Sequence, residues 1–276
     1  QISFMTLISH IIPGNSRSMG LALFGIMGQL PFPLSIGLGE SLYYNYGLNI
    51  IILVSFVCFA ASFIFLRFSK EEKQTLESSH ETRSLKDFIP VFRNRGIYPF
   101  LIAFFCLGYV FGTFLVYLPG FLFSKDINRI GLFWIIFPVI IIIIRLFFSR
   151  FFVRQSRGRT LLLPLLSLPL SMLSLLFVRS YPMLIIPGIL YGISHGISFP
   201  VLTAALIDHA PQGFRGRMVV IAQLMFTLGI FLSSHIGGFI AEAVSIDTVV
   251  FFTAVFSAAP ALLFIYLSVK RRACCN

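Results

Sequence analysis

Residues 97–122 read IYPFLIAFFCLGYVFGTFLVYLPGFL, an apolar run without a single charged side chain. A helix that crosses the ~30 Å hydrocarbon core of a bilayer needs about 20 predominantly apolar residues. This run is longer than that. Its glycines and prolines are tolerated in membrane helices, because neighbouring helices satisfy the freed backbone groups. The stretch therefore predicts a membrane-spanning helix.

Similar apolar runs recur along the whole chain, so a single N-terminal signal peptide does not explain them. The composition agrees, since 57% of residues are hydrophobic and 11% charged, against roughly 25% charged in soluble domains. We expect an all-α, polytopic membrane protein with eight full spans. The seven further spans lie near residues 18–39, 48–67, 130–150, 160–178, 182–207, 217–241 and 247–269.

The basic residues between the spans predict the orientation of the chain. Of the 21 Lys and Arg residues, 17 fall on one side of the predicted topology and three on the other, and Arg145 lies inside a span. Positive residues accumulate in cytoplasmic loops. The net charge of +11 therefore reflects membrane topology and not a nucleic-acid footprint. We expect an integral protein of the cell (plasma or inner) membrane with a cytoplasmic C-terminus.

One connection is long and mixed in charge, which indicates a linker between two helical bundles. The expected domains are a bundle ending at residue 67, a central cytoplasmic loop over 68–96, a six-helix bundle over 97–272 and a tail over 273–276. Residues 2–12 look like the end of a further membrane helix. We therefore expect residues 1–67 to be the remainder of an N-terminal bundle, truncated upstream.

The chain also repeats itself at a distance of about 200 residues. The segments 13–17 (PGNSR) and 211–215 (PQGFR) each open a glycine-containing span that ends in an acid, Glu40 or Glu242. Parallel repeats related by an axis along the membrane normal are a known transporter plan. Chance similarity between apolar helices is the alternative.

With this repeat and the central loop, the sequence resembles the major facilitator superfamily, which has twelve spans in two six-helix halves. The resemblance covers nearly the whole chain. It implies that residues 2–12 end the family's fourth helix and that the eight spans are its helices 5 to 12. It also implies that helices 1 to 3 and most of helix 4 belong to the full-length form.

Two segments resemble family motifs. Residues 145–159 (RLFFSRFFVRQSRGR) are similar to a gating motif, although the motif's Asp is absent, and plain positive-inside anchoring is the alternative. Residues 229–238 (GIFLSSHIGG) are similar to an antiporter-type pattern, with helix packing as the alternative. The expected gating residues are Arg145, Arg150, Gly158, Arg159, Asp208 and Arg215.

Ionisable residues inside a bilayer are costly and usually face an interior cavity. His195 lies in mid-span, where it could bind substrate, relay a proton or serve as a structural histidine. Arg145 could instead snorkel to the interface. The expected cavity residues, several of them placed by the resemblance, are Tyr109, Thr113, Tyr117, Tyr191, Ser194, His195, Ser198, Gln223 and Gln29.

The sequence favours a secondary transporter of a small organic solute by alternating access, with proton-coupled efflux ahead of an uptake symporter. The alternative is an inactive or non-transporting truncated protein that serves as a scaffold or assembly partner. No metal cluster, P-loop or nucleophile–base arrangement appears, so we expect neither an enzyme nor a cofactor or metal. The expected partners are the substrate, protons and the lipid bilayer, and not nucleic acid.

Overall fold

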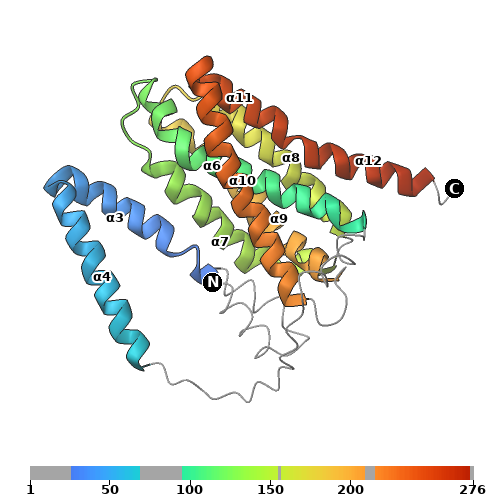
Figure 1. Cartoon of the computed structure of the whole chain (residues 1–276), viewed down its shortest axis with the longest axis horizontal. Coiled ribbons are helices and arrows are strands. Elements are labelled where there is room, and N and C mark those ends of the chain that lie inside the picture. Colours follow the sequence, from blue (N-terminus) through green and yellow to red (C-terminus); the bar gives the residue numbers. More distant parts are fainter. Residues whose placement is uncertain (1–25, 69–94, 155–156, 209–214, 274–276) are drawn as a thin grey trace.

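The computed structural model describes residues 26–68, 95–154, 157–208 and 215–273, and these are almost entirely helical, without a strand. The all-α prediction is therefore confirmed (Figure 1). The helices are α3 (Pro31–Tyr46), α4 (Leu48–Phe68), η3 (Arg95–Ile97), α6 (Tyr98–Phe123), α7 (Gly131–Arg154), α8 (Arg157–Leu176), η4 (Tyr181–Leu184), α9 (Ile185–Asp208), α10 (Arg215–Ala243), α11 (Ile246–Ser257) and α12 (Ala259–Ala273).

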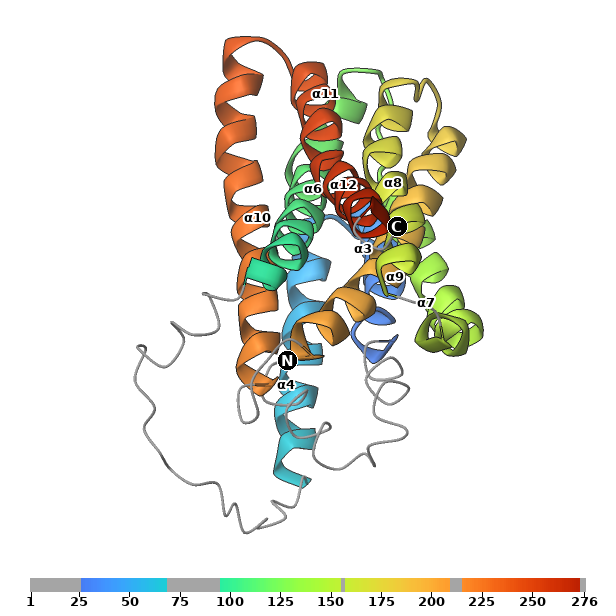
Figure 2. The same ribbon diagram turned by 90° about the vertical axis from the view of Figure 1, so that its right-hand side faces the viewer.

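Helices α6 to α12 form one bundle with α9 at its centre. α9 packs against α7 and α8, while α6 packs along α10 and α11. α3 lies against α7. α4 follows α3 and stands apart from the bundle in Figure 1, whereas in the view of Figure 2 its upper part overlaps the bundle. No residue of the apolar stretch Leu48–Phe65 of α4 is buried. Its surface is thus suited to lipid or to further helices.

Five stretches of the described residues are long and apolar enough to cross a membrane. The described parts of α7 and α8 add two shorter apolar helices, Gly131–Phe147 and Leu161–Leu176. Together they confirm the prediction of an integral, polytopic protein. The five are Leu48–Phe65, Tyr98–Phe123, Tyr181–Asp208, Met218–Ala243 and Ile246–Leu267.

Two predicted spans differ from the observed helices. The span predicted at 18–39 begins outside the described residues; α3 itself starts at Pro31 and runs on to Tyr46. Proline suits a first helical turn because its missing N–H would be unpaired there. Gly47, at φ 77°, ends the helix in a conformation that glycine adopts readily. The span predicted at 247–269 is interrupted at Ala258, because Pro260 has no N–H to donate to the carbonyl of Phe256 four residues earlier.

Glycines allow α6 and α10 to approach backbone to backbone. A Cβ added at Gly229 would overlap the carbonyl oxygen of Phe105 and lie 2.7 Å from the amide nitrogen of Tyr109. Gly108 meets the backbone of Phe226 just as closely from the other side. Gly229, in the 229–238 segment, therefore serves close helix packing.

A second glycine series brings α9 onto α7. A Cβ at Gly192 would lie 2.7 Å from Cβ of Ile140, and one at Gly196 would lie 3.4 Å from Cα of Ile141. The side chain of Ile144 reaches the same glycine, at 3.5 Å. This contact places the neighbouring Arg145 at the level of the middle of α9.

Candidate functional site

The polar residues of α9 lie inside the bundle, where the sequence predicted a shared face. Tyr191, Ser194, His195 and Ser198 occupy two turns of this helix, and all four are buried. The hydroxyl of Tyr191 lies 3.4 Å from Nδ1 of His195, a weak hydrogen bond at best. The structure thus brings together four of the predicted cavity residues.

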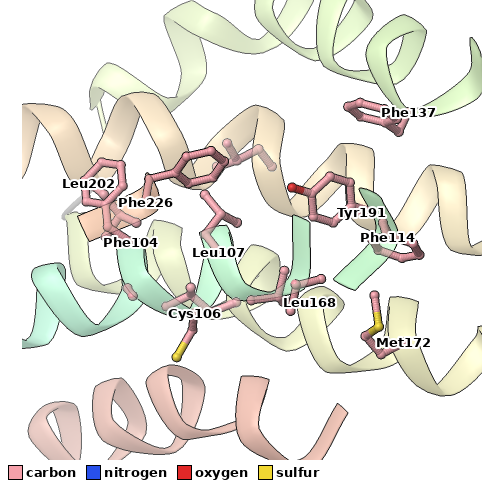
Figure 3. Packing of buried hydrophobic residues seen from close by; sticks show 14 of the residues in the cluster. Phe104, Cys106, Leu107, Phe114, Phe137, Leu168, Met172, Tyr191, Leu202 and Phe226 are labelled. Carbon is pink, nitrogen blue, oxygen red and sulfur yellow. The ribbon is translucent and has the colours of Figure 1, made fainter. Parts of the chain in front are cut away.

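Aromatic rings surround this polar group. The ring of His195 is stacked on Phe199 at 5.3 Å between centroids and meets Phe226 at 5.7 Å. Figure 3 shows Phe114 and Phe137 beside Tyr191, with Phe226 and Leu107 further along the core. Such rings exclude water and lower the local dielectric, which strengthens every polar interaction among the four residues. The sequence offered no signal for which phenylalanines would surround the site.

Arg145 reaches the same region from α7. Its side chain is only 7% exposed, and the contact of Ile144 with Gly196 places Arg145 beside the part of α9 that carries His195. Among the described residues it forms no ion pair, and its Nε is buried without a hydrogen-bond partner. The expectation that Arg145 snorkels to the surface is therefore wrong: the α7–α9 packing holds the side chain inside the bundle.

The predicted α6 residues point away from the α9 group. The ring of Tyr109 packs on Phe256 of α11, with centroids 4.9 Å apart. The hydroxyls of Thr113 and Thr253 lie 3.2 Å apart, and Tyr117 donates a hydrogen bond to the backbone of α10. These three side chains hold α6 against α10 and α11, and the structure does not join them to His195.

The two predicted glutamines lie elsewhere. Gln29 is half-buried in the turn before α3, and not inside a helix as expected. Gln223 is half-buried on α10, where its carbonyl accepts a bond from the hydroxyl of Thr227. No described contact joins either amide to the α9 group.

A groove of about 420 Å³ separates α3 from the loop that follows α6. The hydroxyl of Tyr44 donates a 3.0 Å hydrogen bond across this boundary to the carbonyl of Asn128. The sequence did not predict this contact, because the two residues are 84 positions apart. The other lining residues are mostly apolar: Ile36, Gly39, Tyr43, Pro119, Phe123, Ile127 and Ile130.

Lys125 ties three helices together at the same end of the bundle. Its Nζ donates to the carbonyl of Leu176 at 3.3 Å and lies 3.6 Å from a carboxylate oxygen of Asp247. It also lies 4.4 Å from the ring centroid of Phe121. These contacts join the ends of α6 and α8 to the start of α11.

Comparison with known families decides what kind of protein carries this bundle. The Major Facilitator Superfamily matches the chain in two overlapping stretches, residues 1–179 and 156–273. The chain belongs to this superfamily. The superfamily consists of membrane transporters rather than enzymes, so the chain is an integral membrane transporter in general terms. No curated protein matches the chain.

Five of the six predicted gating residues of this superfamily member lie at or near helix ends, whereas Arg145 lies inside the bundle. Asp208 is the last residue of α9 and is exposed. Arg150 lies near the end of α7, Gly158 and Arg159 lie in the first turn of α8, and Arg215 begins α10. The side chains at these last four positions lie outside the described part of the structure. The gating role of these residues therefore stays a prediction.

The described residues of this superfamily member contain no group of three His, Cys, Asp or Glu side chains that could hold a metal ion. The core residues can form hydrogen bonds, supply the positive charge of Arg145 and make aromatic contacts. Those are the means of binding a solute reversibly.

Proposed function

We propose that this superfamily member is a secondary active transporter that moves a small organic solute by alternating access. One observation carries the proposal: a histidine and an arginine, His195 and Arg145, lie buried in the middle of two membrane helices. Buried ionisable residues are expensive within a bilayer and generally mark a substrate or ion pathway. Structural packing alone would be served more cheaply by apolar side chains.

The moving parts are the two bundles on either side of residues 68–96. One bundle is expected over residues 1–67, of which α3 and α4 are the described helices, and the other over residues 97–272, with α6 to α12. α3 contacts α7 directly, and Tyr44 and Asn128 add a polar contact at one end. Rocking of one bundle against the other about a site at mid-depth is the expected cycle.

The solute site comprises Tyr191, Ser194, His195 and Ser198, with Arg145 across from them. His195 is the candidate for proton coupling, because imidazole can take up and release a proton. Beside the buried cation Arg145 it would take up that proton only while an anion offsets the arginine's charge. Efflux is the favoured direction because residues 28–39 (GQLPFPLSIGLG), in the span equivalent to the family's helix 5, carry a looser form of the antiporter-type pattern. The distribution of basic residues supports a cytoplasmic C-terminus in the plasma or inner membrane. In that orientation the groove between α3 and the 124–130 loop opens outward.

Counterflow tests the proposal. The purified chain is reconstituted in liposomes loaded with one member of a panel of small organic solutes, and entry of the labelled solute is measured. The proposal expects a transient accumulation for at least one solute, faster than in protein-free liposomes. A folded, correctly inserted protein that gives no counterflow for any solute, with either pH gradient, would refute it.

A further inference from the structure

The buried side-chain polar atoms that lack a hydrogen-bond partner in the described structure lie on two helices that pack against each other, α7 and α9. They are Nε of Arg145 and the hydroxyl oxygens of Ser194 and Ser198. All three lie on α7 or α9, and the two serines lie within one turn of His195. Buried polar atoms are nearly always paired, so several orphans in one place call for an explanation such as an absent ligand.

The positive charge of Arg145 has no partner among the described carboxylates. The ion pair found in the described residues joins Lys125 to Asp247 at the end of the bundle. The carboxylate residues whose side chains are described are all exposed and lie at or beside helix ends: Asp126, Asp208, Glu242 and Asp247.

Arg145 and His195 both lie at membrane depth. At a rise of about 1.5 Å per residue, Arg145 is roughly 21 Å from the start of α7 at Gly131, and His195 is roughly 15 Å from the start of α9. The hydrocarbon core is about 30 Å thick, so His195 lies near its middle and Arg145 lies inside it but closer to one face. A cation at this depth is strongly stabilised by an anion and destabilised by a second cation.

The orphan groups share one chemical character, because each can donate a hydrogen bond. A guanidinium only donates, in a planar fork that matches a carboxylate, and the serine hydroxyls can donate as well. Around them the surfaces are aromatic, with Phe199 and Phe226 on the ring of His195. A ligand that satisfies both features carries an anionic head and an apolar body.

We infer that the transported solute is a small organic anion. Its carboxylate binds between Arg145 and the α9 residues Ser194, His195 and Ser198. Its apolar or aromatic body packs on the surrounding rings. This inference rests on the proposed transport function and names the substrate class for the same site. The cluster is enclosed in this conformation, so the solute enters it only when α7 and α9, which belong to the same bundle, move apart from each other or from their neighbours. Neutral and cationic analogues of equal shape bind weakly, because they leave the charge of Arg145 uncompensated.

Thermal stabilisation tests the inference without requiring transport. The full chain in lipid nanodiscs is heated with cyclohexanecarboxylate, benzoate or phenylacetate and, separately, with the matching neutral amides. Unfolding is followed by the emission of Trp134, the chain's one tryptophan, which is 4% exposed when folded. A carboxylate at a hundred times its Kd is expected to raise the midpoint by roughly 5 °C. Its amide is expected to leave the midpoint unchanged.

Three variants test whether the stabilisation by carboxylates arises at the proposed anion site. Arg145→Gln is expected to weaken carboxylate binding at least tenfold while leaving the midpoint of the unliganded protein equal or higher, because an uncompensated buried charge is removed. A purely structural arginine would give a lower midpoint instead. Arg179→Gln, at an exposed arginine outside the helices, is the control and should bind like the wild type. Ser198→Ala removes an unpaired hydroxyl, so it should fold and bind carboxylates several-fold more weakly.

The outcomes separate the two proposals. Stabilisation by none of the carboxylates, equal stabilisation by the amides, or unchanged carboxylate binding in folded Arg145→Gln and Ser198→Ala would overturn the anion site. Carboxylate binding without counterflow would keep the anion site and refute transport. Counterflow of only neutral or cationic solutes would keep transport and overturn the anion site.

Discussion

Replacing Gly229 by alanine probes the contact on which the α6–α10 pair depends. The added Cβ would overlap the carbonyl oxygen of Phe105 and lie 2.7 Å from the amide nitrogen of Tyr109, both of them backbone atoms of α6. No side-chain rotation relieves this overlap, so α6 and α10 must separate. Overpacking of this kind costs about 1–3 kcal/mol, and the upper end applies to a backbone obstacle. Alanine regains about 1 kcal/mol of helix propensity, which leaves a net loss of roughly 2 kcal/mol.

Gly238→Ala is the matched control on the same helix. There the nearest heavy atom to an added Cβ is the hydroxyl oxygen of Tyr117 at 3.5 Å, an ordinary van der Waals contact. Alanine at this position should therefore be neutral or slightly stabilising. The assay is equilibrium unfolding in detergent micelles with Trp134 emission as the signal. If the Gly229 variant is as stable as the Gly238 variant, the close approach of α6 and α10 is not what stabilises the bundle.

Three further substitutions address the contacts at the end of the bundle and the titratable group. Lys125→Met should lower the free energy of unfolding by about 1 kcal/mol or less, because the ion pair between Lys125 and Asp247 is partly exposed. A much larger loss would mean that this ion pair contributes more than its exposed geometry implies. Tyr44→Phe removes the hydrogen bond to Asn128 and should speed amide hydrogen exchange in the last turn of α3, with unchanged exchange as the contrary result. For His195→Gln, the solute flux into proteoliposomes is measured as a function of pH. The pH dependence of the flux should become flatter while counterflow continues. An unchanged pH dependence would mean that a group other than His195 carries the proton.

The helices were predictable because a run of about 20 apolar residues, long enough to cross a membrane, can be recognised from the local sequence alone. The run at 97–122 needs no partner to be recognised, and it became α6 almost residue for residue. The positions at which a helix is interrupted were less predictable. Pro200 lies inside the continuous helix α9, whereas Pro260 follows the break at Ala258. In a membrane bundle the neighbours decide which proline is accommodated, and a local pattern does not contain that information.

The orientation of side chains within the bundle was the harder problem. Tyr109 and Thr113 lie on an apolar helix whose sides look alike in sequence, and they turned out to face α11 and not His195. Arg145 shows the same limit, since its position near one end of a span allowed snorkelling. Its burial follows from the fit of Ile141 and Ile144 against Gly196, a contact between residues more than fifty positions apart. A repeated glycine at a spacing of four was the available signal for such contacts.

The motion of the two bundles can be measured directly as a distance. Spin labels are attached to cysteines introduced at Asn45, beside the end of α3, and at Arg129, in the loop after α6, both exposed, in a chain whose native cysteines are replaced by serine. Alternating access predicts two populations of distances in pulsed electron paramagnetic resonance, with proportions that change when a solute binds. A single narrow distance that is the same with and without a solute shown to bind would contradict the account.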